Sequence, residues 1–226
     1  MDKRPVGFFD SGIGGKCIEE AFKRLCPREN TIYIADSAHC PYGNKSNEEI
    51  TALAEACTLR LLEHDCKMIV VACNTATAAA IDYLRNKYPR IPFVGIEPAV
   101  KPAVLESKSG IVGVLATQGT FSGRLYNETK EKFAKDVTII ATVADEFVTI
   151  VERGLVDAPE TEDIVRKRIE PILAAGADVL VLGCTHFPHL KSVIERVAGG
   201  RARIVEPSGA VARQARRILE ERGLMA

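Results

Sequence analysis

Short runs of β-branched and aromatic residues alternate with amphipathic stretches along the sequence, and this alternation limits the possible folds more than any other feature. The runs expected to be strands are Val6–Phe9, Thr31–Ala35, Met68–Ala72, Phe93–Ile96, Ile111–Ala116, Val137–Val143, Val179–Leu182 and Arg203–Val205. The stretches with helical periodicity include Glu48–His64, Ala76–Lys87, Phe121–Ala134, Glu162–Ala175 and Ala210–Arg222, with Asn47 and Thr161 as expected N-caps. The pattern predicts an α/β fold of parallel strands covered by helices.

Two of the apolar runs end in the same way. Val70-Val71-Ala72 leads into Cys73-Asn74-Thr75, and Leu180-Val181-Leu182-Gly183 leads into Cys184-Thr185-His186. The two cysteines lie about half of the 226 residues apart, which predicts two similar halves. The stretch Pro98–Gly110 contains two prolines and mixed charge, and it is the expected first crossing between these halves.

Charge and apolar patterning narrow the class of partner. The chain has 30 basic and 30 acidic residues, so its net charge gives no reason to expect nucleic acid or an anionic membrane as a partner. No apolar stretch approaches the roughly 20 residues of a membrane span, and the start lacks the apolar region of a signal peptide. The seven cysteines are an odd number without repeat spacing. We therefore expect a cytoplasmic protein with free thiols and a small-molecule partner.

Polar residues follow the expected strands, at the edge where parallel sheets bind ligands. The segments are Asp10–Gly15, Asp36–Gly43, Cys73–Thr75, Glu97–Pro98, Thr117–Thr120 and Cys184–His186. Their thiols, hydroxyls, amides and Gly-rich backbone would suit a small zwitterion that carries carboxylates. The glycine turn fails the dinucleotide fingerprint because position 17 is Cys, and it fails the phosphate-loop pattern because Asp10 replaces the first Gly. Its backbone N–H groups could still bind a carboxylate.

Cys73 and Cys184 differ from the other cysteines in their placement. Each follows an apolar strand and precedes an expected helix N-terminus, where the helix dipole lowers the pKa of a thiol. The remaining cysteines are interpreted as buried small hydrophobes: Cys17, Cys26, Cys40, Cys57 and Cys66. Two such placements in matching halves favour a catalytic pair of thiols.

A metal site at Cys184, His186 and His189 is the alternative for the second segment. No second Cys/His pair at suitable spacing follows, so no metal is expected. His186 is better explained as an orienting or proton-relaying partner of Cys184. His189 is expected on the surface.

Six runs, taken in order, resemble the glutamate racemases of the aspartate/glutamate racemase family. They are Phe9–Gly15, Pro41–Gly43, Ala72–Ala76, Gly95–Pro98, Thr117–Thr120 and Gly183–His186. The resemblance implies two similar parallel-sheet α/β domains facing each other across a cleft: residues 1–97 with 207–226, and residues 98–206. It also implies a cytoplasmic homodimer that interconverts L- and D-glutamate without metal or other cofactor and supplies D-glutamate for peptidoglycan.

The resemblance also assigns roles to individual residues. Cys73 and Cys184 would be the two bases, serving the D and the L enantiomer respectively. Asp10 would assist Cys73, His186 would assist Cys184, and Glu152 would be a further carboxylate near the second thiol. The substrate would be held by Asp10, Ser11, Pro41, Tyr42, Gly43, Asn74, Thr75, Thr117, Thr120 and Thr185.

The sequence departs from the family's usual pattern in a few places, and other functions stay open. Ala144-Asp145-Glu146 stands where an apolar segment is expected, Lys16-Cys17 replaces a usually apolar pair, and the chain is short. The acidic pair is expected to lie solvated on the surface. Aspartate is an alternative substrate; a cysteine hydrolase or amidase would need Cys184 but not Cys73, and a binding protein of the same architecture would need neither thiol.

Overall fold

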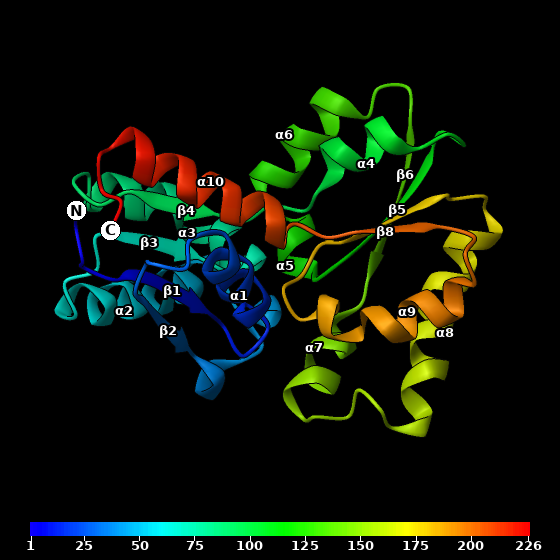
Figure 1. The fold of residues 1–226 in the computed structure, drawn as a ribbon. Coiled ribbons are helices and arrows are strands. Elements are labelled where there is room, and N and C mark those ends of the chain that lie inside the picture. Colours follow the sequence, from blue (N-terminus) through cyan, green and yellow to red (C-terminus); the bar gives the residue numbers. More distant parts are fainter. The chain divides into compact units, whose positions relative to one another are not determined.

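The computed structural model describes residues 1–226 and divides into two compact units. The first unit contains Met1–Ile96 and Ser208–Ala226, and the second contains Glu97–Pro207. Each unit holds one four-stranded sheet whose strands are all parallel (Figure 1). The predicted α/β class is confirmed.

The sheet of the first unit has the strand order β2-β1-β3-β4. Its strands are β1 (Val6–Asp10), β2 (Thr31–Ala35), β3 (Met68–Val71) and β4 (Phe93–Gly95). Its helices are α1 (Lys16–Leu25), α2 (Asn47–Glu63), α3 (Asn74–Lys87) and α10 (Ser208–Glu221), with short 3₁₀ turns at Ser37–His39 and Tyr42–Asn44. The central strands β1 and β3 are fully buried because helices cover both faces of the sheet.

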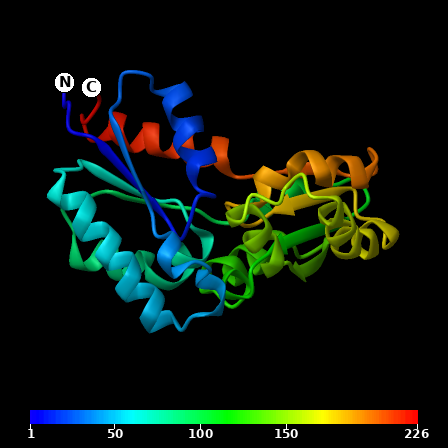
Figure 2. The same cartoon turned by 90° about the horizontal axis from the view of Figure 1, so that it is seen from below.

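The helices of the first unit form two layers (Figure 2). Helices α1 and α10 pack together on one face, over a core that includes Phe8, Phe22 and Ala215. Helices α2 and α3 pack together on the other face. The C-terminal helix α10 therefore completes the core of the unit that the N-terminal residues begin.

The sheet of the second unit has the order β6-β5-β7-β8. Its strands are β5 (Ile111–Ala116), β6 (Thr138–Val143), β7 (Val179–Leu182) and β8 (Arg203–Val205). Its helices are α4 (Val100–Glu106), α5 (Gln118–Phe121), α6 (Arg124–Phe133), α7 (Asp145–Glu152), α8 (Pro159–Ala174) and α9 (Lys191–Ala198), with a 3₁₀ turn at Phe187–Leu190. The central strand β7 is again fully buried, whereas the edge strand β6 is half-exposed.

Three local predictions were wrong. The N-cap of α2 is Ser46 rather than Asn47, because Ser46 and Glu49 form a capping box in which each side chain binds the other's backbone N–H. Thr161 does not cap α8 either: it lies inside the helix and donates to the carbonyl of Leu155 at 2.6 Å. The single helix predicted over 121–134 is two helices, because the extended backbone of Gly123 separates α5 from α6.

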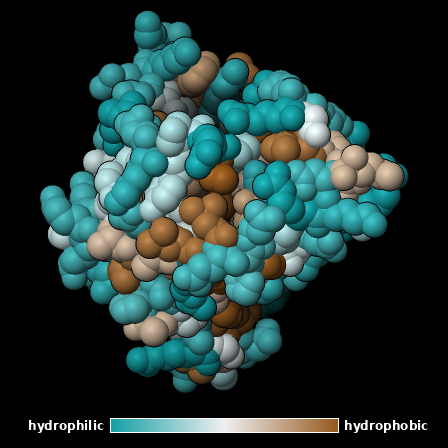
Figure 3. All heavy atoms as spheres, turned by 90° about the vertical axis from the view of Figure 1, so that its left-hand side faces the viewer, coloured by the Kyte–Doolittle hydropathy of each residue, from teal (hydrophilic) through white to brown (hydrophobic).

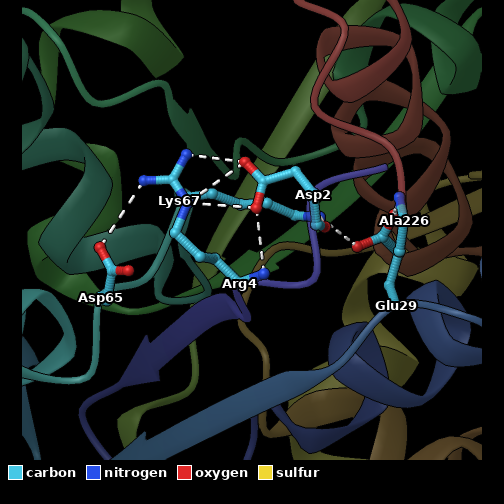
Figure 4. Close-up of polar contacts among 6 residues, drawn as sticks. All are labelled: Asp2, Arg4, Glu29, Asp65, Lys67 and Ala226. Carbon is cyan, nitrogen blue, oxygen red and sulfur yellow. Dashed lines mark hydrogen bonds and ion pairs between the residues drawn. The ribbon is translucent and has the colours of Figure 1, made fainter.

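A buried ion pair lies at the amino end of the first sheet (Figure 4). Lys67 Nζ is 2.7 Å from Glu29 Oε2, and both side chains are almost fully buried. Lys67 also donates to the carbonyl of Asp2, and Glu29 Oε1 accepts the backbone N–H of Ala226 at 2.7 Å. The pair thus connects the segment before β1 to the residues after α10.

The outer surface is largely polar where both chain ends lie. Figure 3 shows mainly hydrophilic residues on that face, with apolar side chains near its centre. None of the helices combines the length and the apolar composition needed to cross a membrane.

Candidate active site

The glycine turn after β1 folds back against the end of β3. Asp10 is fully buried, and its Oδ2 accepts the backbone N–H of Gly15 at 2.9 Å. A Cβ at Gly15 would lie 2.8 Å from the carbonyl oxygen of Ala72, so only glycine allows this approach. The approach places Ser11 Oγ 3.7 Å from Cys73 Sγ. Asp10, Ser11 and Cys73 therefore occupy one small region of the first unit.

Cys73 is the N-cap of α3, as its position after an apolar strand predicts. Its Sγ accepts the backbone N–H of Ala76 at 3.4 Å, and its side chain is buried. Asn74 and Thr75 form the first turn of α3 and are buried beside it. A helix N-terminus and a donated N–H both stabilise negative charge, so this position favours the thiolate.

The loop after β2 is organised by Asp36. Its Oδ2 accepts the hydroxyl of Tyr42 at 2.6 Å, and its Oδ1 lies 2.8 Å from Nδ1 of His39. Tyr42 is buried, and burial together with the bond to Asp36 raises the pKa of its phenol well above the ordinary value. The predicted residues Pro41 and Gly43 flank Tyr42 and are half-buried. Sequence reasoning missed Asp36 as a loop-organising residue, although it directly follows β2 and Asp10 similarly ends β1.

Cys184 follows β7 in the second unit and faces a histidine–carboxylate pair. Cys184 Sγ is 3.8 Å from His186 Nδ1, and His186 Nε2 is 2.5 Å from Glu152 Oε1 at the end of α7. Cys184 and His186 are buried, and Glu152 is half-buried. The imidazole thus lies between the thiol and the carboxylate. The carboxylate can hold Nε2 protonated while Nδ1 faces the thiol.

The helix expected directly after Cys184 is absent. A 3₁₀ turn at Phe187–Leu190 follows instead, and α9 begins only at Lys191. Pro188 in that turn lacks a backbone N–H, and the turn is too short for the aligned dipole of a full helix. His189 is exposed in this turn, as predicted.

The predicted hydroxyl residues of the second unit are buried at the same edge of its sheet. Thr117 is the N-cap of α5, and its Oγ1 lies 3.0 Å from that of Thr120. Thr185 is buried beside Cys184. A Cβ at Gly183 would lie 2.8 Å from the carbonyl oxygen of Leu115, so glycine lets the two strand ends approach as Gly15 does in the first unit.

The other cysteines are free thiols in a different environment. Burial raises the pKa of Cys57 to about 12 and of Cys66 to about 11, and it also raises that of Cys26. These three match the predicted buried, unreactive role. Cys17 and Cys40 are only half-buried, which corrects that interpretation for both.

The two acidic residues that depart from the family's pattern behave differently from each other. Glu146 is half-buried, with its side chain 33% exposed, and it forms an ion pair with Arg168. Asp145 is half-buried, and its Oδ1 accepts the backbone N–H of Gln118 at 3.3 Å. Burial raises the pKa of Asp145 above its ordinary value.

Comparison with known proteins agrees with this arrangement. The model of the Asp/Glu/Hydantoin racemase family matches residues 16–215. A curated glutamate racemase from Roseiflexus is 46% identical over 98% of this chain and 82% of its own length. A glutamate racemase isoform from Bacillus anthracis superposes with a TM-score of 0.89 at 31% identity, covering 100% of this chain and 85% of that one.

A further solved structure is the Escherichia coli glutamate racemase in complex with L-glutamate and the activator UDP-MurNAc-Ala. It has a TM-score of 0.88 and 35% identity, and the match covers 96% of this chain and 83% of that one. The family model covers most of the chain, and identity to the Roseiflexus relative extends over nearly all of it. The chain therefore belongs to the aspartate/glutamate racemase family.

Proposed function

We propose that this protein interconverts L- and D-glutamate through proton transfer by Cys73 and Cys184. The observation that carries the proposal is the pair of thiols at matching strand ends, with the Ala76 N–H beside Cys73 and the His186 imidazole beside Cys184. Inversion at the α-carbon requires a base on one face and an acid on the other. One thiolate removes the α-proton, the opposite thiol donates its own proton to the other face, and the two thiols exchange protonation states.

Each thiol has its own supporting group in this proposal. Asp10 assists Cys73 from the glycine turn, and His186 assists Cys184 with its ring held by Glu152. In the direction that starts from L-glutamate, Cys184 is the base; in the direction from D-glutamate, Cys73 is the base. This assignment follows the family resemblance.

The surrounding residues would stabilise the charge that develops on the substrate. An α-carbanion next to a carboxylate gains most from donors that strengthen their hydrogen bonds as charge accumulates. We propose that carboxylates of the substrate bind the backbone and hydroxyl donors of the site, and that Asp10 faces the ammonium group. The donor residues are Ser11, Tyr42, Gly43, Asn74, Thr75, Thr117, Thr120 and Thr185, and Pro41, which has no N–H, contributes a shaping contact.

The reaction as proposed needs no metal or pyridoxal phosphate, because the chain supplies both proton-transfer groups. Activity should therefore survive chelators and carbonyl reagents and be lost on thiol alkylation. Loss of activity on chelation that one specific metal restores would overturn this part of the proposal. We further propose that the protein is a cytoplasmic homodimer and that its D-glutamate enters peptidoglycan.

The direct test is an assay of D/L interconversion by chiral chromatography without added cofactor. Glutamate, aspartate and several neutral amino acids are offered separately as each pure enantiomer. We expect glutamate to be racemised fastest, since the curated relatives that match nearly the whole chain are glutamate racemases. Faster turnover of aspartate would make aspartate the substrate in place of glutamate. If no amino acid is interconverted, the proposed function is overturned.

A further inference from the structure

The glycine turn is also held from the neighbouring strand. Tyr33 lies on β2 in register with Phe8 of β1, and its hydroxyl donates to the carbonyl oxygen of Gly12 at 2.8 Å. Burial raises the pKa of this phenol far above its ordinary value, so the hydroxyl keeps the proton that it donates. The side chain thus fixes the Gly12–Ile13 peptide, one residue beyond Ser11.

Lys16 holds the ring of Tyr33 in place. Its Nζ lies 4.2 Å from the centroid of the Tyr33 ring and 2.8 Å from Glu19 Oε2. A cation over an aromatic face is attracted to the ring's negative face. Lys16 is one of the two residues after the glycine turn that depart from the family's usual apolar pair, and the ring contact gives this departure a structural use.

Glu19 anchors Lys16. Its side chain is 4% exposed, and it also accepts from Lys23 Nζ at 2.8 Å and from Thr31 Oγ1 at 2.6 Å. Burial alone would raise the pKa of this carboxyl, but the bonds from the two lysines and Thr31 outweigh it and lower the pKa. Because Thr31 lies on the same strand as Tyr33, the ionised carboxylate joins α1 to β2.

We propose that Tyr33 is a positioning residue for Cys73, acting through the Gly12 carbonyl and Ser11. The inference rests on the proposed two-thiol function. Ser11 Oγ is 3.7 Å from Cys73 Sγ, close enough for the hydroxyl to turn toward a thiolate and stabilise it. A turn that is fixed at Gly12 by Tyr33 and at Gly15 by Asp10 keeps that hydroxyl in reach. Cys184 belongs to the other unit.

The test uses elimination, which needs only one base, so that the contribution of each thiol is measured on its own. Tyr33→Phe keeps the ring, its packing and the contact with Lys16, and it removes only the donation to Gly12. A neutral hydrogen bond contributes about 1 kcal/mol, so we expect roughly fivefold slower elimination from β-chloro-D-alanine, which relies on Cys73. Elimination from the L enantiomer, which relies on Cys184, should change less than about twofold. Tyr83→Phe is the matched control, because its hydroxyl bonds Glu55 on the surface of α2.

A second readout does not depend on turnover. The rates at which iodoacetamide alkylates Cys73 and Cys184 are measured by peptide mass spectrometry across pH. Tyr33→Phe should move the pH profile of Cys73 upward and slow its alkylation about threefold to fivefold at neutral pH, while Cys184 keeps its profile. Lys16→Gln should shift Cys73 in the same direction by about twofold, and because Lys23 and Thr31 still bind the Glu19 carboxylate this variant is expected to fold.

The outcomes are distinct. Equal changes at both thiols, or no change at either, in Tyr33→Phe would overturn the positioning role. A wild-type protein that racemises no amino acid would overturn the proposed function instead, and the alkylation contrast would still decide the role of Tyr33.

Discussion

The two units place a thiol at the same point of the same sheet topology, yet they surround it with different groups. In the first unit Cys73 caps a 14-residue helix and receives a backbone N–H. In the second unit Cys184 precedes a 3₁₀ turn and faces His186, whose other nitrogen binds Glu152. Backbone dipoles therefore surround Cys73, whereas a titratable side chain faces Cys184. The position at the strand end is thus common to both units, and the polar group beside the thiol differs.

The opposite ends of the two sheets show a parallel difference. Lys67 directly precedes β3 and binds the segment before β1 through the carbonyl of Asp2. Asp178 directly precedes β7 and binds the segment before β5, accepting from Ser107 Oγ at 2.6 Å and Lys108 N at 2.7 Å. A lysine makes this contact between neighbouring strand starts in the first unit, and an aspartate makes it in the second. Lys67 is fully buried with a carboxylate partner, whereas Asp178 is half-buried and bonds neutral donors.

Removing either thiol should have the largest effect. Cys73→Ser and Cys184→Ser should each lower racemisation of glutamate by at least about 10³-fold, since a hydroxyl is too weak an acid to supply the base. Cys73→Ser should retain elimination from β-chloro-L-alanine, and Cys184→Ser should retain it from the D enantiomer. Cys66→Ala is the control and should keep full activity. A Cys73→Ser protein that racemises at the wild-type rate would leave Cys184 as a lone nucleophile, as in a hydrolase.

Breaking the buried ion pair should destabilise the protein strongly. Lys67→Ala leaves the Glu29 carboxylate buried without its cation, which costs about 3–5 kcal/mol of unfolding free energy. The double variant Lys67→Met with Glu29→Gln removes both charges and should cost less than half as much. Lys191→Ala, which loses a surface pair with Glu195, should change stability by under about 1 kcal/mol. Urea unfolding measures all three, and a double variant no more stable than Lys67→Ala would contradict the role of the unpaired carboxylate.

Neutralising the supporting groups should sharpen the contrast between the two thiols. Asp10→Asn keeps an oxygen for the Gly15 N–H, and His186→Asn removes the imidazole beside Cys184; each should lower kcat about 10- to 100-fold. Because enantiomers have equal free energy, kcat/KM for glutamate must fall equally in both directions. The asymmetry should therefore be measured by elimination: Asp10→Asn slows the D substrate and His186→Asn slows the L substrate. The same enantiomer preference in both variants would refute separate partners.

The smallest effect is expected at Asp178, and it depends on pH. Partial burial acts to raise the pKa of Asp178, but bonds from Ser107, Ser109 and Lys108 outweigh it and lower the pKa from 3.8 to about 2. A carboxyl with a lowered folded-state pKa stabilises the fold above its unfolded value and loses that contribution as pH falls toward about 2. Asp178→Asn should therefore cost about 1 kcal/mol at pH 7, with solvent exposure limiting the effect, and the difference should vanish near pH 2. A difference that persists unchanged at pH 2 would exclude the charge as its source.

The sequence by itself determined the α/β class, the strands and the residues that follow them. These depend on local patterns: buried parallel strands need continuous apolar runs, and the polar residues after Val71 and Leu182 must stand at the carboxyl edge. The helix N-caps were less well determined by the sequence, because neighbouring polar residues can serve equally well. In α2 the N-cap is Ser46 rather than Asn47, since Ser46 forms a capping box with Glu49. Family resemblance, rather than periodicity, pointed to Glu152, because α7 gives it no distinctive local pattern.

Only the tertiary structure decided which groups meet. The contact of Glu152 with His186 joins residues 34 apart in sequence, and that of Tyr33 with Gly12 joins residues 21 apart. Neither follows from a local period, because such contacts depend on how helices and loops pack onto the sheet. The Lys67–Glu29 pair is a further case. Charged residues suggest a solvated surface, but the packing of both chain ends buries this pair. Each buried charge then needs the other as its partner.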